Sequence, residues 1–115
     1  MDVTTNTFPQ DVIERSKELP VIVDFWAAWC GPCRMLGPAI ESEVAKREGK
    51  IELAKVDVDA EQELAGRYGI QSIPTVVVFR DGKPVTGFVG AHAAATISGF
   101  LDETIEKHGG AVDAA

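Results

Sequence analysis

Two cysteines lie three positions apart directly after an apolar run, and this arrangement constrains the fold more than any other feature of the chain. The run, residues 21–28, reads as a buried strand, and Cys30 and Cys33 are the only cysteines among the 115 residues. If a helix begins at about Gly31, both side chains share one face of its first turn. A strand that delivers a Cys-x-x-Cys pair to the start of a helix is typical of thiol–disulfide exchange.

Length, composition and charge favour one compact domain and argue against several other classes of protein. With 115 residues and 45% hydrophobic content, we expect a single domain over 1–115, with 110–115 as a frayed tail. The formal net charge of −7 argues against nucleic acid or an anionic membrane as a partner. No apolar run is long enough to span a membrane, and residues 1–20 do not resemble a signal peptide. We therefore expect a cytoplasmic protein and, since nothing indicates an obligate apolar interface, a monomer.

Helical and strand patterns alternate along the chain, which predicts an α/β fold. The expected elements are helices over about 8–16, 30–49, 59–69 and 94–109, and strands over 21–28, 51–58, 75–79 and 84–89. With one further strand before the first helix, the expected order is β-α-β-α-β-α-β-β-α, which predicts a mixed sheet of about five strands, flanked on both faces by four helices.

Several local signals refine these boundaries. Thr7-x-x-Gln10 has the form of a capping box for the first helix, and Asp59 is expected to cap the third. Pro38 lies inside the second helix and should kink it, because proline removes a backbone donor. Asp81-Gly82 predicts a tight hairpin, so that 84–89 returns as an antiparallel edge strand.

The position of the two cysteines predicts different roles for them. Cys30 would lie at the helix N-terminus, where free N–H groups and the helix dipole favour a thiolate that attacks a disulfide. Cys33, one turn further on, is expected to be more buried and to resolve the mixed disulfide, which leaves a Cys30–Cys33 bridge. Gly31 and Pro32 add no cation that would stabilise the thiolate, which favours a reductant over an oxidant.

Two alternatives compete with this interpretation. A Cys-x-x-Cys pair is half of many zinc sites, but zinc needs two more ligands, and His92 and His108 are remote and unpaired. The chain could also be a binding module or scaffold whose redox state is incidental, although a scaffold would need neither cysteine. We expect no bound metal.

Asp24 and Lys55 interrupt two apolar strands that are predicted to be neighbours. Burial of a carboxylate at Asp24 would raise its pKa, whereas a position at a wet strand end would leave it solvated. The two side chains could pair, or share a proton-carrying water, behind the cysteines. Asp24 would then accept the proton of Cys33 as that thiol becomes a nucleophile.

The remaining candidates are the two tryptophans that precede the cysteine pair, one proline and one glycine. We expect Trp26 to be part of the core and Trp29 to form an exposed apolar rim. From the residues alone, the Ile73–Pro74 peptide bond is expected to be trans. Gly90 is expected at a turn or at a close approach of two backbones.

Four segments together resemble the thioredoxin family. They are 23–34, which contains Trp-Cys-Gly-Pro-Cys; 68–75, which ends in Ile73-Pro74-Thr75; and the pair Phe79-x-Asp81-Gly82 and Val89-Gly90-Ala91. The similarity extends from about residue 8 to residue 108 and implies the thioredoxin fold and a protein-disulfide reductase.

The resemblance also implies roles for individual residues. Cys30 would attack and Cys33 would resolve; Asp24 would be the buried carboxylate, with Lys55 its neighbour. Pro74 would be a cis-proline facing the cysteines, Asp59 would bind the indole of Trp26, and Pro38 would mark the helix kink. The surface that contacts substrates would include Trp29, Val58, Ile73, Pro74, Gly90 and Ala91.

The family implies particular partners as well. Electrons would come from NADPH through a flavin-dependent thioredoxin reductase, and the chain itself would bind no cofactor. Its clients would be disulfide-containing proteins such as ribonucleotide reductase, peroxiredoxins and methionine sulfoxide reductases.

Overall fold

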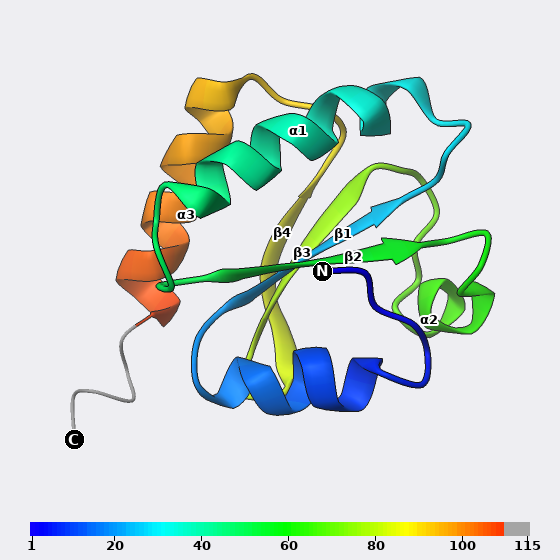
Figure 1. Cartoon of the computed structure of the whole chain (residues 1–115), viewed down its shortest axis with the longest axis horizontal. Helices are drawn as coiled ribbons and strands as arrows, with labels where there is room; N and C mark the ends of the chain where they lie inside the picture. Colours follow the sequence, from blue (N-terminus) through cyan, green and yellow to red (C-terminus); the bar gives the residue numbers. More distant parts are fainter. Residues whose placement is uncertain (110–115) are drawn as a thin grey trace.

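The computed structural model describes residues 1–109 and has a four-stranded mixed sheet at its centre (Figure 1). The expected frayed tail, 110–115, lies outside the described residues. The strands are β1 (Val21–Trp26), β2 (Glu52–Asp57), β3 (Thr75–Arg80) and β4 (Lys83–Val89), in the spatial order β2-β1-β3-β4. The helices are η1 (Pro9–Glu14), η2 (Arg15–Lys17), α1 (Gly31–Ala45), α2 (Gln62–Arg67) and α3 (Ala94–His108). Only β1 and β2 pair in parallel; β3 is antiparallel to both β1 and β4.

Alternation along the strands divides the core between the two faces of the sheet, as period-2 patterning requires. Val23 and Phe25 of β1 pack on the face covered by η1 and α2. Ile22, the residue before Val23, points to the other face and packs against Leu36 of α1 and Ile97 of α3. Asp24 has the same parity as Ile22, so its carboxylate belongs to the face covered by α1.

The predicted α/β fold is confirmed, but the sheet has four strands rather than about five. Next to β2, the start of the chain makes only a single isolated parallel bridge, between Asp2 and Lys55. Two backbone hydrogen bonds frame that bridge, from Val3 N to Lys55 O (2.9 Å) and from Lys55 N to Met1 O (2.8 Å). Three residues are too few to extend a ladder, although they cover the otherwise exposed edge of β2.

Both predicted helix caps are wrong. The reciprocal bonds at the first helix join Thr4 and Thr7, from Thr4 N to Thr7 Oγ1 (2.9 Å) and from Thr7 N to Thr4 Oγ1 (3.2 Å), so the box begins one turn early. The helix then winds as π and 3-10 turns. Before α2, the carboxylate of Asp57 accepts from the Asp59 N–H at 2.9 Å, and Asp59 itself does not cap the helix.

The predicted hairpin is confirmed, since Asp81 and Gly82 have φ angles of 57° and 82°. Positive φ at both central residues gives the tight turn whose twist matches that of the flanking strands. The turn places β4 at the edge of the sheet, next to β3 alone.

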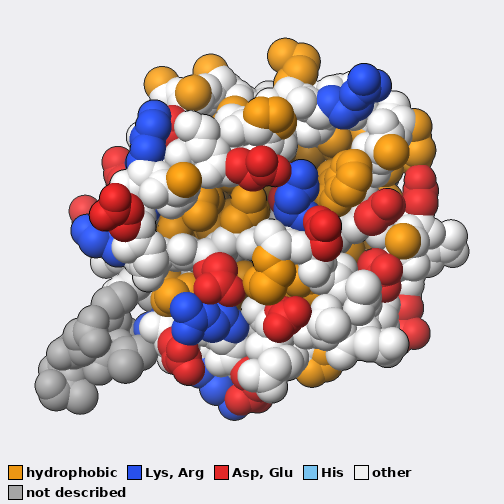
Figure 2. All heavy atoms as spheres, viewed as in Figure 1, with side chains coloured by type: hydrophobic (Ala, Val, Ile, Leu, Met, Phe, Trp, Pro, Cys, Tyr) orange, Lys and Arg blue, Asp and Glu red, His pale blue; other side chains and the backbone are white. Residues whose placement is uncertain are grey.

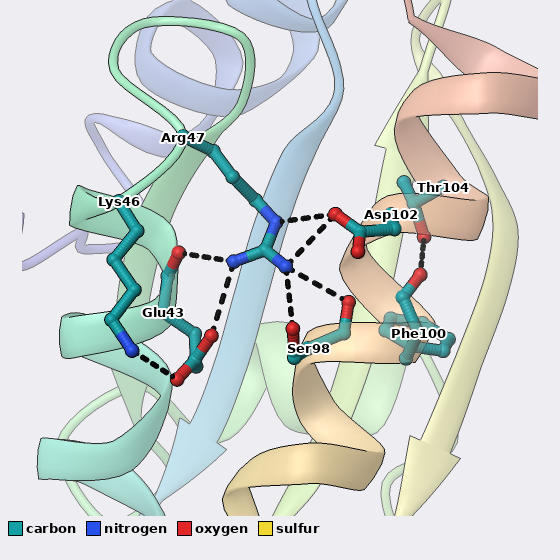
Figure 3. A network of polar contacts seen from close by, with 7 residues as sticks. All are labelled: Glu43, Lys46, Arg47, Ser98, Phe100, Asp102 and Thr104. Atoms are coloured by element: carbon teal, nitrogen blue, oxygen red, sulfur yellow. Dashed lines mark hydrogen bonds and ion pairs between the residues drawn. The ribbon is translucent and has the colours of Figure 1, made fainter.

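An arginine just after α1, with a side chain that is 11% exposed, joins the end of α1 to the first half of α3 (Figure 3). The guanidinium of Arg47 donates to the carbonyl of Glu43 at 2.7 Å and to its carboxylate at 3.2 Å. It also donates to the carbonyl and hydroxyl of Ser98, at 3.0 and 2.8 Å, and to Asp102 at 3.0 Å. Hydrogen bonds from Lys46 and from Arg47 to the Glu43 carboxylate lower the pKa of Glu43.

Replacement of Arg47 by methionine is expected to lower the free energy of unfolding by about 2–4 kcal/mol. The variant removes one of the two cations bound to the buried Glu43 carboxylate, together with the donor to Ser98 and Asp102, and the arginine side chain is only 11% exposed. Urea denaturation followed by circular dichroism measures the change. Lys46→Met is the matched control: its side chain is 65% exposed and should cost less than about 1 kcal/mol. Equal losses for the two variants would contradict the role given to Arg47.

Candidate active site

The two cysteines form a disulfide at the N-terminus of α1, where β1 delivers the chain. Their Cα atoms are 5.3 Å apart. Cys30 is the N-cap residue, as predicted, and its sulfur accepts a hydrogen bond from the Cys33 N–H at 3.2 Å. Gly31 and Pro32 lie exposed between them in the first helical turn. The helix N-terminus therefore stabilises negative charge on the sulfur of Cys30.

Burial does not separate the two cysteines in this oxidised state. Cys30 is 4% exposed and Cys33 is 3% exposed, so the order is the expected one but the difference in exposure is negligible. The physical reason is a shared apolar cover, to which Trp26, Val58 and Ile73 contribute. What distinguishes the two sulfurs is their position relative to the helix N-terminus.

Asp24 is a buried carboxylate without a partner. It lies inside β1 rather than at a wet strand end, is 1% exposed, and neither of its carboxylate oxygens has a hydrogen-bond partner. Burial raises the pKa of Asp24 to about 6, while the nearby charge of Lys55 lowers this pKa and that of Glu41 raises it. The group therefore gains and loses a proton close to neutral pH.

Lys55 is the cross-strand neighbour of Asp24, as expected, but the two do not form an ion pair. In the register of β1 and β2 they are direct partners. The ammonium group of Lys55 instead binds Glu41 of α1 at 3.0 Å and lies 5.0 Å from the centre of the Trp26 ring. Glu41 was not among the residues predicted for the site. It is half-exposed on α1 and no local pattern marks it, since its contact with Lys55 depends on how α1 crosses the sheet.

The two tryptophans differ in exposure. Trp29 is 68% exposed, as expected, and Trp26 is half-buried. The indole N–H of Trp29 donates to the carboxylate of Asp59 at 2.8 Å. The predicted bond between Asp59 and Trp26 is therefore wrong, because the Asp59 carboxylate binds Trp29 instead, while the ammonium group of Lys55 lies over the ring of Trp26.

The proline loop approaches the disulfide from the start of β3. The Ile73–Pro74 bond is cis, so the trans expectation is wrong and the expectation from the family resemblance is confirmed. Gly90, with φ of 91°, donates its N–H to the Pro74 carbonyl at 2.8 Å, which joins the two loops. Ala91 follows on the exposed surface. Pro38 lies inside α1, which continues past it to Ala45, and the kink there stays a prediction.

Hydrophobic side chains gather on the surface near the end of β1 and the start of α1, with acidic side chains around them (Figure 2). Among residues 1–109, no three histidine, cysteine or acidic side chains form a group that could hold a metal ion. No helix in this part of the chain is long and apolar enough to cross a membrane.

Comparison with known proteins agrees with this geometry. The thioredoxin family model matches residues 1–103. The chain is 45% identical to Thioredoxin 1 of Nostoc sp. over 106 residues, which cover 92% of this chain and 94% of that protein. It is 44% identical to Thioredoxin 1 of Synechococcus elongatus, with 88% and 92% covered, and 42% identical to thioredoxin of Mycobacterium tuberculosis, with 90% and 87% covered.

A disulfide at a helix N-terminus, facing a proline loop on a mixed sheet, defines a thiol–disulfide oxidoreductase. The chain belongs to the thioredoxin family. It is therefore a protein-disulfide oxidoreductase that works through a redox-active disulfide, and a scaffold role is not favoured. Members of this family generally work with thioredoxin reductase and with disulfide-containing client proteins.

Proposed function

We propose that this chain reduces disulfides in client proteins in two steps. The thiolate of Cys30 attacks one sulfur of the client disulfide, the client S–S bond breaks, and one client thiol leaves. Cys33 then attacks the sulfur of Cys30 and releases the second client thiol. Two electrons pass to the client and Cys30–Cys33 becomes a disulfide. The observation that carries this proposal is the Cys33 N–H donating to the Cys30 sulfur at the N-cap of α1.

Asp24 is proposed to accept the proton of Cys33 in the second step. Its burial, its lack of a hydrogen-bond partner and its pKa of about 6 support this role, because a base is most effective when its pKa lies near the working pH. Lys55 takes part by stabilising the ionised carboxylate. Gly31 and Pro32 provide no cation to the thiolate, which favours a reducing potential.

The client is proposed to bind over an apolar rim around the disulfide. Val58 and Ile73 pack against the cluster that contains the two cysteines, and Trp29, the residue before Cys30, is 68% exposed. Ile73 would offer its backbone to an extended client segment, and Pro74 follows it in the rim. Gly90 and Ala91 complete the rim, because the Gly90 N–H is bonded to the Pro74 carbonyl.

The wider pathway is proposed from the family. NADPH would supply electrons through a flavin-dependent thioredoxin reductase, for clients such as ribonucleotide reductase, peroxiredoxins and methionine sulfoxide reductases. The chain would act as one monomeric domain in the cytoplasm and carry out electron transport there. The formal charge of −7 supports protein partners over nucleic acid.

Selective alkylation tests the assignment of the attacking thiol. In the reduced protein at pH 7, iodoacetamide is expected to label Cys30 before Cys33, and faster than a free cysteine by about tenfold or more. Peptide mass spectrometry after a timed quench identifies the labelled residue. Cys30→Ser serves as the control, since the remaining thiol should react slowly. Faster labelling of Cys33, or rates no higher than that of a free thiol, would overturn the proposal.

A further inference from the structure

The carboxylate of Glu41, on α1, binds the lysine that lies opposite Asp24 in the sheet. Its Oε2 is 3.0 Å from the ammonium nitrogen of Lys55, and the side chain of Glu41 is 52% exposed while that of Lys55 is 21% exposed. The cation is also in contact with the face of Trp26, 5.0 Å from the ring centre. These contacts direct the lysine toward α1.

The alternative position of this cation is beside Asp24. Paired residues on neighbouring strands are close in space, and Asp24 and Lys55 project from the same face of the sheet. A buried carboxylate without a hydrogen-bond partner would bind a nearby ammonium group strongly. Yet both oxygens of Asp24 lack a partner, and the lysine binds Glu41.

We propose that Glu41 is a positioning residue: by binding Lys55 against α1 and Trp26, it leaves Asp24 without an ion-pair partner and so available to take up the proton of Cys33. This inference rests on the proposed role of Asp24 in the resolving step. The charged groups that act on Asp24 are Lys55 from β2 and Glu41 from α1. On its other side, Asp24 pairs with the uncharged Val76 of β3. The exposure of Glu41 allows its removal without opening the core.

Removal of the Glu41 charge should free Lys55 to move toward Asp24. In Glu41→Gln, the pKa of Asp24 is expected to fall by about one unit or more, because an opposite charge at close range favours the ionised acid. Carboxyl-carbon NMR titration of the oxidised protein measures this shift directly. In single-turnover experiments, the acid limb of the rate profile for resolution of the mixed disulfide should move to lower pH by the same amount.

A double-mutant comparison separates positioning from the direct effect of the Glu41 charge. In a Lys55→Met background, Glu41→Gln should shift the pKa of Asp24 much less than it does when the lysine is present. Glu63→Gln is the matched control, since it removes the same charge from an exposed ion pair with Arg67 on α2 and should shift nothing.

Three results would overturn the inference: no shift in Glu41→Gln, the same shift with and without Lys55, or the same shift in Glu63→Gln. Failure of the proposed function has a different signature. In that case the NMR titration of Asp24 would move as expected in Glu41→Gln, while the pH profile of the resolving step would stay where it is in the unaltered protein.

Discussion

Replacement of Cys33 by serine is expected to leave the protein covalently attached to its clients. Cys30 keeps its position at the N-cap of α1 and still attacks a client disulfide, but no second thiol remains three residues away to release the product. Steady-state disulfide reduction should fall below detection. On a non-reducing gel, the variant should appear in higher-mass species that disappear when dithiothreitol is added.

Cys30→Ser is the matched control for this trapping experiment. It removes the attacking sulfur and should give neither turnover nor a covalent product, although Cys33 retains its buried position. Mixed disulfides that form equally well with Cys30→Ser would show that the assignment of the two thiols is reversed. Mass spectrometry of the trapped species would identify the client proteins as well.

Replacement of Asp24 by asparagine is expected to stabilise the protein at neutral pH. Burial raises the pKa of this carboxyl from 3.8 to about 6. The folded protein therefore binds more protons than the unfolded chain between these values, and stability falls as pH rises through that window. A difference of about two units corresponds to about 3 kcal/mol lost above pH 6, which asparagine would not lose.

The sign of this effect can be checked by urea denaturation of the oxidised protein at two pH values. At pH 7.5, Asp24→Asn should unfold at higher urea concentration than the unaltered chain. Near pH 3.5, where the carboxyl is protonated in both states, the two proteins should be about equally stable. Asp2→Asn, at an exposed position, is the control and should change stability little at either pH. If Asp24→Asn is less stable than the unaltered protein at pH 7.5, the claim that burial of the Asp24 charge destabilises the protein is wrong.

The same Asp24→Asn variant should be slower in one catalytic step only. Attack by Cys30 does not need the carboxylate, whereas Cys33 must lose its proton to attack, and general base catalysis of this kind contributes about 10²-fold or more. Rapid-quench analysis of the mixed disulfide separates the two steps. An unchanged second step would refute the role of Asp24.

Features set by neighbours along the chain could be predicted from the sequence. The helix start at Cys30 follows from Gly31 and Pro32, and the tight hairpin follows from Asp81-Gly82, because both depend on local backbone preferences. The two-sided core also follows from strand alternation. Local signals were less reliable at the first helix, where Thr4 and Thr7 form the reciprocal bonds, and before α2, where no side chain caps the helix.

Contacts between elements distant in the sequence were decided by the tertiary structure alone. The binding of Lys55 to Glu41, and of Asp59 to Trp29 rather than Trp26, depends on how α1 and the loop after β2 lie over the sheet. The nearly equal burial of the two cysteines arises in the same way, from the side chains that cover them. The sequence alone determined that the reactive cysteine pair lies at the start of α1 and that Asp24 is the carboxylate inside the preceding strand. The packing of α1 decided that Lys55 binds Glu41 rather than Asp24, because α1 brings a carboxylate within reach of the long lysine side chain.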